Sequence, residues 1–252
     1  MKKLFVTILG LVAATSLSAQ SPQEVVEKAV AAMGGEEAVA KYSDYQAEGE
    51  AKYSMWGREL TGTIEIIEKG KKKRTKTELA FGKSTFVMIN AFDGETAFSE
   101  RQGRIIDKPA LNYESDLDHT LGVLIDKGAV FSLGKQTEID GRRATGIEAE
   151  LNGKKTTFFI DDESFLVSEM VFEDTFFGEN NTKELIQKRI RYEDYQEFEG
   201  VRFPTRMTFY EKGEKQRELE IAQISFAPEV TADLFQRPEQ ELDLRYSEER
   251  MD

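Results

Sequence analysis

The sequence predicts a mainly β protein, with one antiparallel sheet of about ten to twelve strands. Three observations predict it. From residue 45 to residue 226, apolar and polar residues mostly alternate, which is the period of strands with one buried face. Short glycine-bearing turns, such as Asn152-Gly153 and Lys212-Gly213, separate the alternating runs. No fixed-period repeat or low-complexity linker divides the chain, so a single domain is expected, and a sheet of so many strands curls into a barrel or a partly closed barrel.

The N-terminus has the pattern of a secretory signal peptide. Lys2 and Lys3 precede an apolar run over 4–14, and small and polar residues follow over 15–19. The run is shorter than the roughly 20 apolar residues that a membrane span needs. We therefore expect residues 1–19 to be a signal peptide cleaved after Ala19. The mature chain would then be exported and soluble, with no transmembrane segment.

Composition limits the classes of partner. The chain has no cysteine, so it forms no disulfide, cannot be a lipid-modified lipoprotein, and depends on its core for stability. Without Lys2 and Lys3, 32 basic residues oppose 47 acidic ones, a net charge of −15. Such a surface repels nucleic acid and anionic membranes. Nucleic acid is therefore excluded as an expected partner.

Two helical segments are expected before the first strand. Ser21, Pro22 and Glu24 have the chemistry of a helix start, including a capping box. An apolar stripe at helical spacing runs to Met33, and Gly34-Gly35 ends it. A short helical turn is expected over 36–41. We interpret the first segment, 21–33, as a helix packed on the sheet.

The first run of strands is expected over 45–53, 60–66, 74–81, 86–88 and 97–98. The segment 109–134 differs, because its leucines recur at helical spacing after a Ser-Asp-Leu-Asp start. It predicts a helix over 116–125, flanked by loops at 111–113 and 129–133 that carry exposed apolar residues. An apolar helix between two runs of strands must lie on a face of the sheet.

The second run of strands is expected over 145–151, 158–160, 166–172, 186–192, 201–209 and 219–226. Residues 172–181 are expected to form a loop or a broken strand that exposes Phe176 and Phe177. A change of parity before Ile224 and Phe226 predicts a bulge in the last strand. A helical turn is expected over 231–235. The domain then covers 20–238, and residues 239–252 are a polar, disordered tail.

A catalytic constellation is hard to assemble from this sequence. His119 is the only histidine, there is no cysteine, and no G-x-S-x-G motif accompanies it. A zinc site needs three or four histidine, cysteine or carboxylate ligands, and a single histidine argues against one. Carboxylate clusters such as Asp161-Asp162-Glu163 lie at expected turns. We therefore expect no enzyme, metal or cofactor, and a hydrolase that uses His119 is the third hypothesis.

An excess of apolar residues on one sheet face remains, with 17 phenylalanines and 7 methionines in the chain. They form either a packed core or, if two short helices cannot fill a curled sheet, a dry methionine-lined cavity for acyl chains. The sequence does not distinguish these alternatives.

The two ends of the mature chain resemble the outer-membrane lipoprotein-sorting (LolA/LolB-like) superfamily, and most closely its free-standing periplasmic members of Bacteroidota type. The resemblance rests on AAMGGEEAVAKYSDYQAEGE at the front, on YEDYQEFEGVRFPTRMTFYEKG and on ELEIAQISFAPEVTADLF. The matched positions are Gly34-Gly35 to Gly49, the Asp194-Tyr195…Gly200…Phe203-Pro204 strand pair, and the turn from Pro228 to Phe235. The arginine that helps to close the lid in such carriers has no match here, since the residues around Arg58 differ.

The resemblance implies an unclosed antiparallel β-barrel, with helices as a lid over a hydrophobic cavity, in a periplasmic carrier of lipoprotein acyl chains or another amphipathic ligand. Envelope proteins would be possible partners. Helices 21–33 and 116–125 would form the lid. The expected ligand-binding residues are Phe86, Met88, Leu121, Leu124, Phe158, Ile160, Met170, Phe172, Ile190, Tyr192, Phe203, Met207 and Phe209. The alternative is a non-enzymatic structural or partner-binding module of the cell envelope with a fully packed core.

Overall fold

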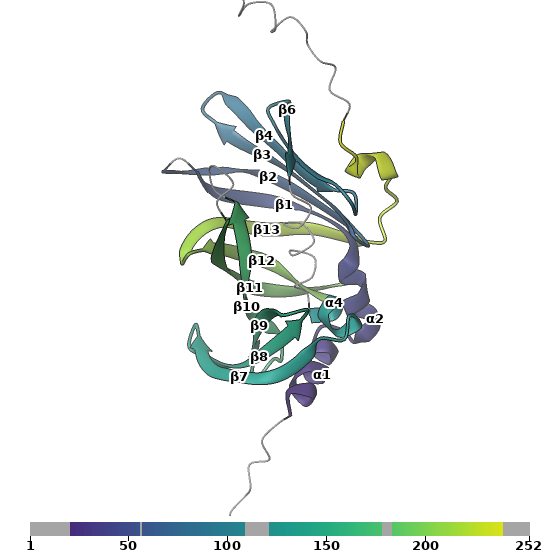
Figure 1. Cartoon of the computed structure of the whole chain (residues 1–252), viewed down its shortest axis with the longest axis vertical. Helices are drawn as coiled ribbons and strands as arrows, with labels where there is room; N and C mark the ends of the chain where they lie inside the picture. Colours follow the sequence, from purple (N-terminus) through teal and green to yellow (C-terminus); the bar gives the residue numbers. More distant parts are fainter. Residues whose placement is uncertain (1–20, 56, 109–120, 178–182, 239–252) are drawn as a thin grey trace, which may run out of the picture.

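The structure is a computed structural model that describes residues 21–55, 57–108, 121–177 and 183–238. Within these residues, thirteen antiparallel strands form one strongly curved sheet (Figure 1). The spatial order is β6-β5-β4-β3-β2-β1-β13-β12-β11-β10-β9-β8-β7. β6 and β7 are consecutive strands in the chain, yet they form the two opposite edges. The predicted fold class, a mainly β, unclosed antiparallel barrel with a few helices, is confirmed.

The helices are α1 (Pro22–Ala32), α2 (Glu36–Ala40), the 3-10 turn η1 (Lys41–Ser43), α4 (Leu121–Asp126) and the 3-10 turn η3 (Ala232–Phe235). The strands before α4 are β1 (Asp44–Met55), β2 (Arg58–Lys69), β3 (Lys72–Phe81), β4 (Ser84–Phe92), β5 (Ala97–Arg101) and β6 (Arg104–Lys108). The strands after α4 are β7 (Val130–Ile139), β8 (Arg142–Leu151), β9 (Lys154–Asp161), β10 (Val167–Phe177), β11 (Lys183–Phe198), β12 (Val201–Glu211) and β13 (Glu214–Phe226).

The two halves of the chain meet where β1 pairs with β13, and this is also where small residues collect. Ala47, Gly49 and Ala51 occupy the concave face of β1, and Gly62 lies on the same face of β2. A Cβ atom built on Gly62 would lie 1.8 Å from the backbone oxygen of Glu78 in β3. Glycine in a strand marks a tight bend or a close backbone approach. These positions therefore let the sheet curl sharply at its centre.

The predicted bulge in the last strand is confirmed. Gln223 pairs with Glu48 but Ile221 pairs with Gly49, so Ala222 is the extra residue of β13. A bulge of this kind bends the strand and increases its twist. The change of parity in the sequence comes from this residue.

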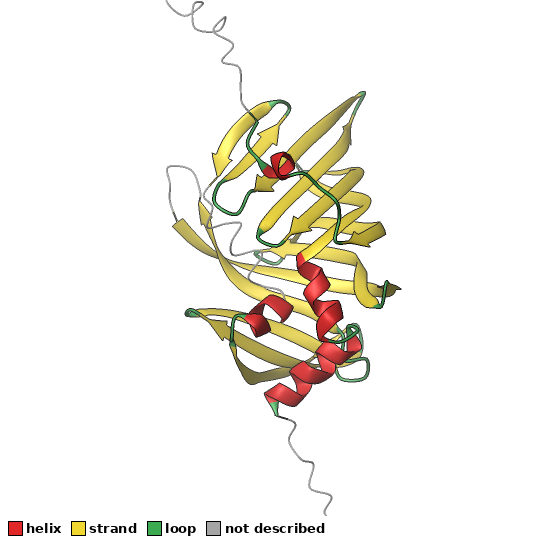
Figure 2. Ribbon diagram, turned by 90° about the vertical axis from the view of Figure 1, so that its right-hand side faces the viewer, coloured by secondary structure: helices red, strands yellow, loops and turns green. Residues whose placement is uncertain are grey.

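The first helix forms as expected. The Ser21 side chain accepts a hydrogen bond from the Glu24 N–H, and the Glu24 side chain accepts one from the Ser21 N–H, which completes the capping box. α1 contacts β7 and β8, and α2 contacts β12 and α4. Figure 2 shows these helices together against one part of the sheet, while η3 packs separately against β3. The helical cover is therefore confined to the β7–β12 half.

Several expectations need correction. The sheet has thirteen strands rather than ten to twelve, because β6 and β7 are also strands. Most of the expected loop at 129–133 belongs to β7, whose Val130 and Leu133 are nevertheless exposed, as expected. Residues 172–181 were expected to form a loop or a broken strand, but 172–177 continue β10 without a break.

Other expectations fall outside the described residues. They are the signal peptide at 1–19, the loop at 111–113, the part of the expected middle helix over 116–120, which includes His119, and the tail at 239–252. The side chains of Phe176 and Phe177, which were expected to be exposed, are also outside the part that the structure describes. The rest of the middle helix is present as α4.

The extension of β10 has a clear physical reason. Asp174 lies on the concave face, where the sequence pattern leads one to expect an apolar residue, and it forms an ion pair with Lys188 of the neighbouring strand β11. Lys188 is the residue that interrupts the apolar row of β11. The two charged side chains compensate one another, so both strands continue through positions that break the alternation.

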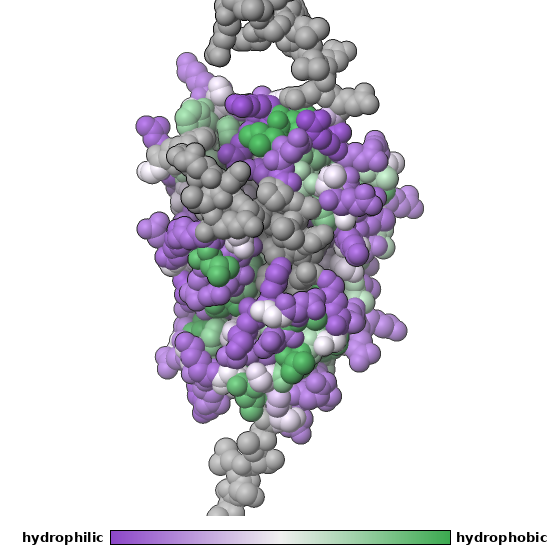
Figure 3. All heavy atoms as spheres, viewed as in Figure 1, coloured by the Kyte–Doolittle hydropathy of each residue, from purple (hydrophilic) through white to green (hydrophobic). Residues whose placement is uncertain are grey.

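The apolar residues of the described chain are largely inside it. On the face seen in Figure 3, hydrophobic patches are separate from one another and lie among hydrophilic side chains. Among the described residues, no helix is long and apolar enough to cross a membrane.

One turn allows a prediction about acid stability. The buried Asp161 carboxylate accepts hydrogen bonds from the Ser164 N–H and hydroxyl, both at 2.7 Å, and lies 2.7 Å from the Arg142 guanidinium. Burial acts to raise the pKa of Asp161, but the bonds from Ser164 and Arg142 outweigh it and hold the pKa below its ordinary value. We expect Asp161→Asn to lower the free energy of unfolding by about 1.5–3 kcal/mol at pH 7, measured by urea denaturation.

The sign of the pH dependence follows from the lowered pKa. The stabilisation is complete above the pKa of an unfolded aspartate, about 3.9, and is lost as the pH falls toward the lower pKa of the folded state. The difference between the wild type and Asp161→Asn should therefore shrink below about pH 4. Glu163→Gln in the same turn is the control, because Glu163 is exposed, and it should change stability by less than about 0.5 kcal/mol. A difference that persists unchanged at low pH would contradict the prediction.

Candidate functional site

The concave face of the sheet carries two large apolar clusters. One joins α1, α2 and α4 to β8, β9 and β10, and includes Val26, Leu121 and Phe158. The other lies on β1, β2, β12 and β13, and includes Phe203 and Leu219. A cavity of about 180 Å³ lies between them, lined by residues of both clusters. The cavity exists because the helices cover only one half of the curved sheet.

Eight of the thirteen residues predicted to bind a ligand line this cavity. They are Leu121, Phe158, Met170, Ile190, Tyr192, Phe203, Met207 and Phe209. The other five do not line it: Leu124, Ile160 and Phe172 are buried in the helix-covered cluster, while Met88 and Phe86 belong to a third cluster with Leu60 and Leu79. The role of the eight in ligand binding stays a prediction.

Aromatic side chains form one wall of the cavity. The Phe203 ring stacks on Tyr42 with 5.1 Å between centroids, and Tyr45 meets it edge-on at 5.3 Å. The Tyr42 hydroxyl donates to the Arg202 carbonyl oxygen, and the Tyr195 hydroxyl donates to the Val167 carbonyl oxygen at 2.9 Å. These bonds satisfy the buried hydroxyls and fix the rings, so this wall presents mainly ring carbon to the cavity.

Burial keeps the phenols neutral. It raises the pKa of Tyr42, Tyr45 and Tyr192 well above the ordinary tyrosine value. Neutral phenols at any physiological pH act as hydrogen-bond donors and not as bases. The wall therefore offers no general base from these groups.

One end of the cavity is polar. Glu68 of β2 is buried, accepts a hydrogen bond from the Tyr45 hydroxyl at 3.3 Å, and lies 2.9 Å from the Lys73 ammonium. Glu68 and Lys73 both line the cavity. The pairing compensates the buried carboxylate, so this end is polar without a net charge.

A second hollow lies among the helices and the start of β7. It has a volume of about 640 Å³ and is lined by α1, α2 and α4 together with Ala129 and Phe131. Val39, Tyr42 and Gly122 line both hollows. A Cβ atom on Gly122 would lie 2.4 Å from Val39 Cγ1, so α4 packs closely on α2 only because residue 122 is glycine. This contact therefore forms part of the wall of both hollows.

The described residues show no metal site at the cavity. They contain no group of three or more histidine, cysteine or carboxylate side chains placed to hold a metal ion. His119, the residue of the hydrolase hypothesis, lies outside the described chain. What the geometry offers is an apolar hollow with polar groups at its limits, which suits binding of a molecule with an apolar body.

Sequence reasoning missed several residues that line the cavity, notably Tyr45, Glu68, Lys73 and Arg217. A signal was present for the charged ones. Glu68 shares the strand parity of Ile64 and Ile66, and Arg217 shares that of Leu219 and Ile221. Charged residues are expected on the solvent face by their type, although here their parity places them on the concave face.

The fold and the cavity together define an open antiparallel half-barrel with a partial helical cover. Solved structures share this fold at low sequence identity. A LolA superfamily protein from Nitrosomonas europaea is 14% identical, with a TM-score of 0.54, over 87% of this chain and 99% of that one. A putative outer membrane lipoprotein-sorting protein domain from Vibrio parahaemolyticus is 12% identical, with a TM-score of 0.52, over 85% and 95%.

A DUF1329 family protein from Desulfovibrio piger is also similar, at 11% identity and a TM-score of 0.55, over 86% of this chain and 98% of that one. No family model and no curated protein sequence matches this chain. The likeness expected from the sequence motifs is therefore confirmed for the fold, and the Bacteroidota type stays a prediction.

Proposed function

We propose that this protein is a non-enzymatic, periplasmic carrier or binding protein that shields an acyl chain of a lipoprotein or another amphipathic ligand. The observation that carries the proposal is the apolar cavity between the helical cover and the concave sheet. Each methylene moved from water into such a site contributes about 0.8 kcal/mol. The shared fold of the lipoprotein-sorting structures supports the proposal, as does the pattern of a signal peptide at residues 1–19.

The size of the cavity decides how binding would occur. A volume of about 180 Å³ is smaller than the roughly 300–1,000 Å³ of most ligand sites. The second hollow, which α1, α2 and α4 line, would add about 640 Å³ if the contact between Val39 and Gly122 opened. A ligand would thus enter by separating α4 from α2, and the joined hollows would hold an acyl chain.

A reversible lock across this contact tests the proposal. A Cβ added at position 122 would lie 2.4 Å from Val39 Cγ1. The Cβ atoms of two cysteines at positions 39 and 122 would therefore be at most about 4 Å apart, which a disulfide can bridge. We expect the double variant Val39→Cys and Gly122→Cys to bind a dansyl-labelled fatty acid when reduced. Oxidation should weaken binding by at least about tenfold, because the hollows stay separated. Fluorescence titration measures both states.

The natural absence of cysteine makes the controls simple. Each single cysteine variant should bind the probe equally well with and without reductant. Equal binding by the oxidised and reduced double variant would exclude entry between α2 and α4. The carrier hypothesis itself fails if the wild type binds no acyl probe and native mass spectrometry of periplasmic material shows no bound lipid.

The alternative, a partner-binding module of the cell envelope with a packed core, is favoured by the small volume of the cavity. In that case the concave face would serve stability alone. The cost of truncating methionines that do and do not line the cavity distinguishes the alternatives, as argued in the Discussion.

A further inference from the structure

Arg217 of β13 lines the cavity without a charged partner. Its guanidinium lies over the Phe209 ring, 3.9 Å from the centroid, and the side chain is half-buried. Among the described residues, Arg217 forms no ion pair and no side-chain hydrogen bond. A guanidinium has five N–H donors in a planar fork that matches a carboxylate or phosphate. These donors are available at the cavity wall.

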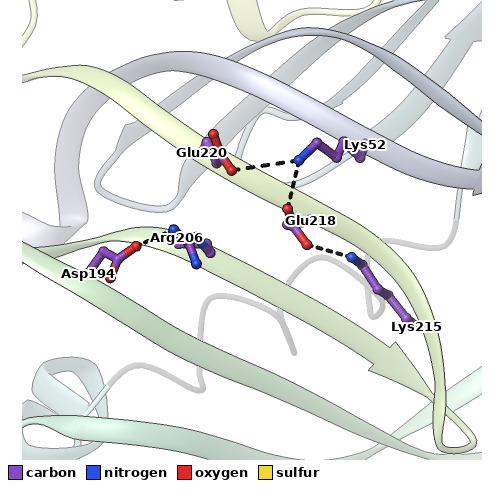
Figure 4. A network of polar contacts seen from close by, with 6 residues as sticks. All are labelled: Lys52, Asp194, Arg206, Lys215, Glu218 and Glu220. Carbon is purple, nitrogen blue, oxygen red and sulfur yellow. Dashed lines mark hydrogen bonds and ion pairs between the residues drawn. The ribbon is translucent and has the colours of Figure 1, made fainter.

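The opposite face of the same strand shows a contrast. Glu218, the next residue, lies 3.0 Å from the Lys52 ammonium and is also paired with Lys215 (Figure 4). Glu220 lies 3.7 Å from Lys52. The charges of β13 on the outer face are thus compensated by protein side chains, whereas the arginine on the concave face is stacked on a ring and otherwise unpaired.

The two polar ends of the cavity, Arg217 and the Glu68–Lys73 pair, lie far apart. Arg217 pairs in register with Tyr53, and Tyr53 pairs with Leu60 of β2, whereas Glu68 lies eight residues further along β2. At about 3.3 Å per residue, the separation is roughly 26 Å along the strand. Most lining residues between these ends are apolar, among them Ile64, Ile66, Met207 and Leu219, and Thr75 beside Ile66 is a polar exception. The helices lie toward the end where β1 begins (Figure 1), so Arg217 lies at the end away from them.

We propose that Arg217 binds the anionic head group of a single-chain amphiphile, of which a fatty acid is the simplest example, while the chain extends along the apolar part of the cavity. This inference rests on the proposed carrier function and narrows its ligand class. The chain would bury against Met207 and Leu219, and the carboxylate would accept a bidentate pair of hydrogen bonds from the guanidinium. An acyl group without an anionic head would leave the arginine unpaired.

The test compares palmitic acid, its methyl ester and hexadecyl phosphate by displacement of a fluorescent acyl probe. The wild type should bind palmitate at least about tenfold more tightly than the ester. Arg217→Met keeps the apolar stem and should bring the two affinities together by weakening the binding of palmitate. Arg217→Lys should restore part of the preference. Arg202→Gln is the matched control on the exposed face of β12 and should keep the full preference.

The outcomes separate this inference from the proposed function. If Arg217→Met retains the preference for palmitate, or if the wild type binds ester and acid equally, the head-group role is overturned while the carrier function stands. Binding of hexadecyl phosphate with the same dependence on Arg217 would support an anionic head group and extend it to phosphates. If no lipid binds to any variant, the carrier function and this inference both fail. Unfolding curves for each variant establish that it is folded.

Discussion

Gly62→Val should abolish stable folding or lower the free energy of unfolding by more than about 4 kcal/mol, the range typical of severe backbone or core disruption. A Cβ atom at position 62 would lie 1.8 Å from the Glu78 carbonyl oxygen and 2.8 Å from the Leu79 Cα, both in the backbone of β3. No side chain can move aside to relieve this contact. β2 and β3 would have to separate and lose hydrogen bonds of the ladder between them.

A glycine with open space around it provides the control. Gly213 has a φ of +84°, and a Cβ added there would meet nothing within 4 Å, so Gly213→Ala introduces conformational strain without a clash. It should cost about 1–3 kcal/mol. Urea denaturation, or the yield of soluble folded protein where Gly62→Val does not survive, measures both. Comparable stability of Gly62→Val and the wild type would show that the close approach of β2 and β3 is not required.

The alternation in the sequence was sufficient to predict the sheet, because one face of nearly every strand is buried. It failed where charge replaces apolar character inside, as in β10, where Asp174 pairs with Lys188 of β11. It also failed at the edge strand β7, where Val130 is 72% exposed and its neighbours give no clean period. Such features depend on which side chains meet across neighbouring strands, and the pattern within one strand does not report this.

The candidate site was partly predictable from the same alternation within the strands. Strand parity placed Phe203, Met207 and Phe209 together on the concave face, and all three line the cavity. Which buried residues face a hollow and which face other side chains depends on how the helices lie on the sheet. Phe172, for example, has the parity of Met170 but is buried in the cluster under the helices.

The difference between a lined hollow and a packed core should be measurable as a difference in stability. Met88 is buried with Leu60 and Leu79 and is not part of the cavity wall, whereas Met170 and Met207 are similarly buried but line the cavity. Removing a side chain costs the lost transfer free energy plus a term for the new cavity. We expect Met88→Ala to lower the free energy of unfolding by about 2–5 kcal/mol.

Met207→Ala and Met170→Ala should each cost at least about 1 kcal/mol less than Met88→Ala, because a side chain beside an existing hollow has fewer contacts to lose. Urea denaturation of the ligand-free protein at pH 7 provides the comparison. Met207→Ala also enlarges the hollow, so it should bind an acyl probe at least as tightly as the wild type. Equal costs at all three positions, with weaker or no binding of the probe by Met207→Ala, would mean that the concave face is packed throughout. The partner-binding alternative would then account for the protein better than the carrier.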